Sequence, residues 1–132
     1  MKYRILIVDD SATTRALVKR VIRMAEVPVS DLLEAPNGRL ALETLTIAAA
    51  AELPVDLILA DLNMPEMDGF EMIRRLRADE RLRRIPIVVL SASPSAEEFA
   101  GLERVDGFVG KPFAPETIRR VILDALEVKH HA

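Results

Sequence analysis

The chain has 132 residues, a length typical of one domain, and 50% of them are apolar while 30% are charged, as in ordinary globular proteins. The 18 Lys and Arg residues are outnumbered by 21 Asp and Glu residues, and this net charge of -3 argues against a nucleic-acid partner. There is no cysteine, no signal-peptide pattern and no apolar stretch of about 20 residues, which excludes disulfides and a membrane span and favours a cytoplasmic protein.

Short apolar segments rich in branched residues recur along the chain, and each is followed by a segment with helical spacing. We expect five strands, at 4–8, 30–35, 55–60, 86–90 and 107–110. The first, third and fourth are almost entirely apolar, as in strands that helices cover on both faces. The pattern therefore predicts repeated strand-helix units.

The segments between these strands predict five helices. The first has a basic face of Arg15, Lys19 and Arg23, which we interpret as solvent-exposed rather than as a docking surface. Its apolar stripe consists of Leu17, Val18, Val21, Ile22 and Met24. The second and third helices follow the turns at 37–38 and 68–69, and the fourth, at 95–104, is short. The fifth begins at Pro115 and ends near Val128, which leaves residues 129–132 as a tail after a single domain at 1–128.

This alternation predicts an α/β fold: a doubly wound, five-stranded parallel sheet with helices on both faces. One common strand order is 2-1-3-4-5, that of the flavodoxin-like fold. Ligands of such sheets bind at the carboxyl ends of the strands. The residues directly after each strand are therefore the candidates for chemistry.

Five polar side chains stand at these strand ends: Asp9, Asp10, Asp61, Ser91 and Lys111. Each alone is more commonly a helix cap, a turn residue or a surface charge. Together they indicate a site, because three carboxylates brought together repel by about 1 kcal/mol per pair at 4 Å even in bulk water. A hard cation such as Mg²⁺ would compensate them, and Lys111 with the Ser91 hydroxyl suits a phosphate group.

Four motifs carry a resemblance to a known family over essentially the full length. They are ILIVDDS at 5–11, DLILADLNMPEMDG at 56–69, IVVLSA at 87–92 and KPF at 111–113. The chain resembles the response-regulator receiver family, as seen in single-domain chemotaxis regulators. The resemblance implies that Asp61 accepts a phosphoryl group from a histidine kinase or a histidine phosphotransfer protein.

The resemblance also implies the roles of the other site residues. Asp10, Asp61 and the Asn63 carbonyl would ligate Mg²⁺, with Asp9 acting through water. Ser91, the Ala92 N–H and Lys111 would hold phosphate oxygens, and Pro112 would follow a cis peptide bond. Ser91 and Phe108 would form the switch that responds to the added charge.

We therefore expect a phosphorylation switch that signals to a protein partner, either as a monomer or as a phosphorylation-linked dimer. It would catalyse only its own phosphorylation and dephosphorylation. The alternative is a pseudo-receiver of the same fold, a dimerisation module that is never phosphorylated. A phosphatase with an aspartyl nucleophile would need a second Asp where this chain has Asn63. A dinucleotide enzyme would need a glycine-rich turn after the first strand.

Overall fold

The computed structural model describes residues 1–61, 69–91 and 105–131, with the side chains of all of these except residues 91 and 128–131. Five parallel strands form one sheet in the order β2-β1-β3-β4-β5, which confirms the predicted order. The strands are β1 (Tyr3–Val8), β2 (Val29–Ala35), β3 (Leu57–Asp61), β4 (Ile87–Ser91) and β5 (Gly107–Gly110). Each lies within two residues of the range expected from apolar patterning.

Four helices lie in the described ranges: α1 (Ala12–Met24), α2 (Gly38–Ala50), α3 (Gly69–Ala78) and α5 (Pro115–His131). The helix expected at 95–104 falls outside the described residues. Helix α5 runs to His131, so the expected end near Val128 was too early. The sequence after Pro115 holds no glycine or proline that would stop a helix there. None of the described helices is long and apolar enough to cross a membrane.

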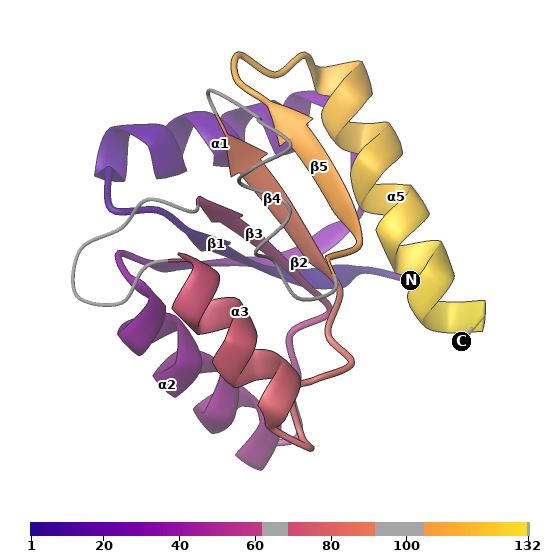
Figure 1. Cartoon of the computed structure of the whole chain (residues 1–132). Helices are drawn as coiled ribbons and strands as arrows, with labels where there is room; N and C mark the ends of the chain where they lie inside the picture. Colours follow the sequence, from indigo (N-terminus) through magenta and orange to yellow (C-terminus); the bar gives the residue numbers. More distant parts are fainter. Residues whose placement is uncertain (62–68, 92–104, 132) are drawn as a thin grey trace.

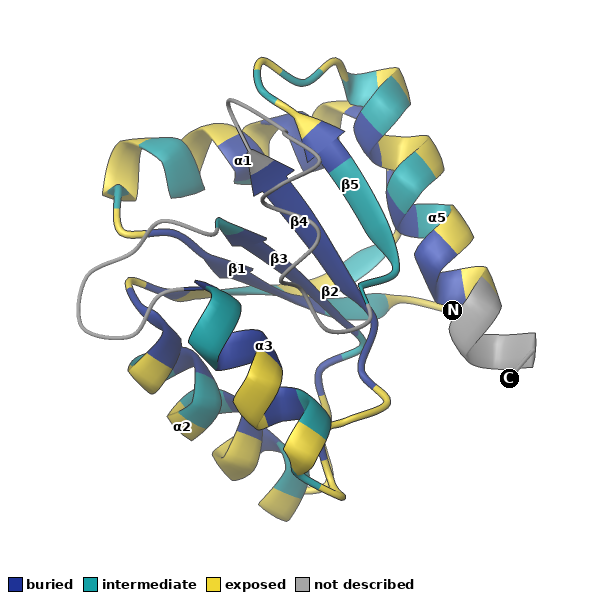
Figure 2. Ribbon diagram, viewed as in Figure 1, coloured by how far each residue is buried: buried dark blue, intermediate teal, exposed yellow. Residues whose placement is uncertain are grey.

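Helices α1 and α5 cover one face of the sheet, and α2 with α3 cover the other (Figure 1). Alternate residues of β1 and β3 point to the two faces, so Leu6 and Ile58 belong to one apolar cluster while Ile7 and Leu59 belong to the other. The central strands are therefore buried on both sides (Figure 2). This double burial explains why their sequences are apolar without alternation.

The predicted apolar stripe of α1 is narrower than the sequence suggested. Val18, Val21 and Ile22 are buried, but Leu17 and Met24 are 51% and 61% exposed. Both residues border the buried part of the stripe. The apolar stripe predicted from the sequence is therefore only partly buried.

Side-chain caps set where the first two helices begin. The Ser11 hydroxyl accepts a hydrogen bond from the Thr14 N–H at 3.2 Å, and the Asn37 side chain accepts one from the Leu40 N–H at 2.8 Å. Helix α1 thus starts only a few residues after β1 ends. The short connection leaves Asp9 and Asp10 at the carboxyl end of the sheet.

The opposite end of the sheet is held by Arg77, which lies in the last turn of α3. Its guanidinium donates to the carbonyls of Arg83 and Ile85, at 2.6 and 3.0 Å, and pairs with Asp106 at 3.2 Å. Asp106 also accepts a hydrogen bond from the Ile87 N–H at 2.9 Å. These contacts connect α3 with the starts of β4 and β5.

Candidate functional site

Three carboxylates converge at the carboxyl edge of the sheet. Asp9 and Asp10 follow β1, and Asp61 is the last residue of β3, the strand beside β1. One oxygen from each carboxylate lies within 4.8 Å of the others. The sequence predicted this convergence from neighbouring parallel strands, and the structure brings the three side chains together. Oxygen ligands at this spacing suit a hard divalent cation.

Asp9 is the buried member of this group, with an exposed fraction of 3%. Its Oδ1 accepts a hydrogen bond from the Ser11 N–H at 2.9 Å, while its Oδ2 is buried with no hydrogen-bond partner among the described residues. Burial raises the pKa of the Asp9 carboxyl, and the charges of Asp61 and Asp10 add to that rise. The Ser11 N–H and Lys111 lower this pKa only in part. The ionised carboxyl therefore lacks enough positive partners.

Lys111 supplies one positive charge from the loop after β5. Its Nζ lies 3.6 Å from Asp9 Oδ2 and 4.0 Å from Asp61 Oδ2. The Lys111–Pro112 peptide bond is cis, as the resemblance implied. One ammonium group and three ionised carboxylates together carry a net charge of -2, which one divalent cation would balance.

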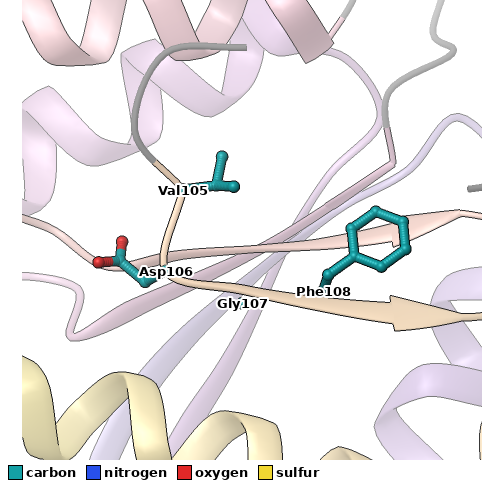
Figure 3. A pocket seen from close by; sticks show the side chains of 4 residues that line it. All are labelled: Val105, Asp106, Gly107 and Phe108. Carbon is teal, nitrogen blue, oxygen red and sulfur yellow. The ribbon is translucent and has the colours of Figure 1, made fainter. Parts of the chain in front are cut away.

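Two strand-end residues from the resemblance, Asn63 and Ala92, lie outside the described residues. Ser91 ends β4, where its backbone is paired in register with Gly110, and its side chain is not described. Phe108 is half-buried on β5, opposite Val89. An open cavity of about 440 Å³, largely exposed to solvent, is lined by Val105, Asp106, Gly107 and Phe108 (Figure 3).

Comparison with known proteins decides the family. The sequence model of the response regulator receiver domain matches residues 5–123. The chain belongs to this family. Chemotaxis protein CheY1 of Helicobacter pylori is 33% identical over 118 residues, which is 88% of this chain and 90% of that protein.

Solved structures agree with the receiver fold. Chemotaxis protein CheY4 of Vibrio cholerae has a TM-score of 0.78 and 29% identity, covering 95% of this receiver chain and 99% of its own. The receiver domain of a sensor histidine kinase from Pseudomonas aeruginosa PAO1 has a TM-score of 0.81 at 22% identity, covering 96% and 99%. That structure has a magnesium ion coordinated in its active-site cleft.

The receiver domain also contains a contact that sequence reasoning missed. One terminal nitrogen of the Arg15 guanidinium donates a hydrogen bond to the backbone carbonyl of Asp9 at 2.6 Å. Arg15 and Lys19 both pair with Glu34 on β2, at 3.1 and 3.2 Å. The interpretation of this helix face as solvent-exposed was therefore wrong for Arg15, whose side chain is 15% exposed, although Arg23 is exposed.

Proposed function

We propose that this receiver domain is a two-component phosphorylation switch in which Asp61 accepts the phosphoryl group with Mg²⁺ bound beside it. The observation that carries the proposal is the convergence of three carboxylates and one lysine at the carboxyl edge of the sheet. Asp61 is suited to the nucleophile's role because its side chain is 16% exposed and so remains accessible to a donor.

The acidic residues fit a magnesium ion on the evidence of their own surroundings. The buried Asp9 Oδ2 has no hydrogen-bond partner in the described part of the chain, and a water bound to a cation would satisfy it. We propose that Asp10, Asp61 and the Asn63 carbonyl ligate Mg²⁺ directly, with Asp9 acting through water. When bound, the ion would neutralise charge on the transferring phosphoryl group.

In the proposed reaction, a carboxylate oxygen of Asp61 attacks the phosphorus of a phosphohistidine on the donor protein. The new O–P bond forms as the N–P bond breaks, and the imidazole leaves to take up a proton from solvent. Lys111 pairs with one phosphate oxygen, while the Ser91 hydroxyl and the Ala92 N–H donate to others. The domain thereby catalyses only its own phosphorylation and dephosphorylation.

The added phosphate carries about -1.5 to -2 charges, enough to move a local two-state equilibrium. We propose that Ser91 moves toward the phosphate and that Phe108 turns inward behind it. The open cavity that Phe108 lines supports this proposal because the side chain borders space that no described residue fills. The changed surface would then be recognised by a downstream protein.

A histidine kinase or a histidine phosphotransfer protein is the proposed donor. A second cavity of about 440 Å³ adjoins the site on the α1 side, and Lys111 lies on its wall. Its other lining residues are Thr14, Leu17, Val21, Pro112 and Phe113. This mostly apolar recess supports approach of a donor protein from that side, because its phosphohistidine must reach Asp61 next to Lys111.

The test is the intact mass of the protein after incubation with acetyl phosphate, with and without Mg²⁺. We expect wild type to gain one phosphoryl group only when Mg²⁺ is present, since the carboxylates otherwise repel an anionic donor. Asp61→Asn should gain none and should remain folded. Asp124→Asn, which removes an exposed carboxyl on α5, is the matched control and should behave as wild type.

Phosphorylation of Asp61→Asn at another residue would refute the assignment of the nucleophile. If neither acetyl phosphate nor a panel of histidine kinases adds a phosphoryl group to wild type, the switch proposal fails. The alternative of a phosphorylation-independent dimerisation module would then take its place.

A further inference from the structure

Arg15 lies near the start of α1 and connects parts of the molecule that are distant in sequence. Its terminal nitrogen donates to the Asp9 carbonyl at 2.6 Å, and its Nε donates to Glu34 at 3.1 Å. The side chain is 15% exposed, so both contacts are largely shielded from water. Arg15 therefore joins the loop that carries two of the site carboxylates to the edge strand β2.

The Asp9 carbonyl is part of the peptide plane that joins Asp9 to Asp10. Because that plane is rigid, a hydrogen bond to its oxygen restrains the backbone of both acids. Two other bonds restrain Asp9 directly: its N–H donates to the Ala35 carbonyl at 3.1 Å, and its Oδ1 accepts from Ser11 at 2.9 Å. Arg15 supplies the contact that restrains the following peptide.

Glu34 holds the other side of the Arg15 guanidinium. Burial alone would raise the pKa of Glu34, but hydrogen bonds from Lys19 and Arg15 outweigh it and keep this pKa below its ordinary value. Glu34 is therefore ionised at neutral pH and gives Arg15 a charged partner. A planar guanidinium can serve a carboxylate and a carbonyl at once, which suits it to this bridging position.

We propose that Arg15 is a positioning residue for the metal-binding carboxylates of Asp9 and Asp10, and that Glu34 orients Arg15. The inference rests on the proposed function, because it takes these carboxylates to hold Mg²⁺. Arg15 itself touches neither the metal nor the phosphoryl group in this assignment. It acts through the peptide between the two acids.

A positioning effect can be separated from a charge effect by its sign. If Arg15 acted only through its positive charge, its removal would make the site more negative and would tighten Mg²⁺ binding. If Arg15 positions the carboxylates, its removal would loosen the loop and weaken Mg²⁺ binding. Residues that orient metal ligands typically change affinity about 10–100-fold when mutated.

The experiment measures the Mg²⁺ dissociation constant of the full chain by NMR titration with MgCl₂ at constant ionic strength. The Ser11 amide is a suitable reporter because it donates to Asp9 Oδ1. We expect Arg15→Met to weaken Mg²⁺ binding about tenfold. Lys19→Met is the matched control. Lys19 also pairs with Glu34, but unlike Arg15 it makes no hydrogen bond to the Asp9 carbonyl in the described part of the chain. Lys19→Met should stay within about twofold of wild type.

Binding by Arg15→Met that equals or exceeds wild type would overturn the proposal, as would an equal loss in Lys19→Met. Wild type that binds no Mg²⁺ would instead refute the metal site of the proposed function. The amide spectra report whether each variant is folded. Should Arg15→Met fail to fold, Glu34→Gln is measured instead. We expect Glu34→Gln to bind Mg²⁺ more weakly than wild type. Unchanged Mg²⁺ binding would refute the orienting role of Glu34.

The role of Glu34 is tested by a double-mutant cycle with Arg15. Glu34→Gln should weaken Mg²⁺ binding in the wild-type chain by less than Arg15→Met does. In the Arg15→Met background it should have no further effect, because its influence passes through Arg15. Equal losses from Glu34→Gln in both backgrounds would show that the two residues act independently and would refute the orienting role.

Discussion

Asp9 and Asp10 are adjacent in the chain and carry the same carboxyl group, yet the fold places them in different environments. Asp9 is buried, and burial raises the pKa of its carboxyl above the ordinary value, whereas Asp10 is exposed. The difference follows from β1, whose end is enclosed by neighbouring strands while the next residue already faces the open edge. A buried carboxylate beside two others is destabilising unless a cation is present.

We therefore predict that Asp9→Asn stabilises the metal-free fold. At neutral pH in EDTA, the free energy of unfolding should rise by about 1–2 kcal/mol, because the variant removes the cost of burying a charged carboxylate and, in second place, its repulsion with Asp61 and Asp10. Asparagine retains an oxygen that can accept the Ser11 hydrogen bond. Urea denaturation measures the change, and a destabilised variant would contradict the prediction.

The pH dependence of this gain has a defined sign. Because the pKa of Asp9 is raised in the folded state, wild type loses stability as pH rises from the ordinary value of 3.8 through the folded pKa. The advantage of Asp9→Asn should thus grow as pH rises from 3.8 through the folded pKa and vanish below pH 3.8, where the carboxyl is protonated in both states. An advantage that persists undiminished in acid would show a different cause.

At the scale of elements, the packing of α5 against β5 depends on Gly107. A Cβ atom at this position would lie 2.6 Å from Val121 Cγ1 and 3.2 Å from Val88 Cγ2. No described glycine has a positive φ, so space rather than backbone conformation requires glycine here. The close approach sets α5 directly on the strand that carries Phe108 and leads to Lys111.

Gly107→Ala should destabilise the fold by about 1–3 kcal/mol, because the added methyl group overpacks this contact. The cost should be smaller when Val121 is also replaced by alanine, which removes the nearest methyl group. Urea denaturation of both single variants and the double variant gives the coupling energy. Additive losses would show that Val121 is not the side chain that the new methyl group meets.

At the scale of the whole molecule, the strand order decides which residues meet. Because β1, β3 and β4 are neighbours and β5 follows, side chains from residues 9, 61 and 111 reach one edge. The site is thus assembled only when the sheet is complete. Metal binding and global folding should therefore be linked.

Mg²⁺ should stabilise the entire domain against urea, since the unfolded chain has no assembled site. At a Mg²⁺ concentration of 100 times its dissociation constant, the expected gain is about 2.7 kcal/mol. Asp10→Asn should show a much smaller gain, and NaCl at the same ionic strength should show none of comparable size. Equal stabilisation by NaCl would indicate charge screening instead of binding.

Local patterns were sufficient to predict much of this protein. Apolar runs locate the strands because a doubly covered strand needs no polar face, and the turn at 37–38 locates the start of the second helix. The position of Asp61 directly after such a run was enough to place it at the functional edge. These features depend on a few adjacent residues, so the sequence alone determined them.

Other features depended on distances between elements and were decided only by the tertiary structure. The burial of Asp9 but not Asp10, the exposure of Leu17 and the Arg77–Asp106 pair are among them. Arg15 reaches Glu34, 19 residues away in sequence, and the Asp9 carbonyl at once. Periodicity shows which face of a helix is basic, but whether that face meets water or a strand edge depends on how closely helix and sheet pack.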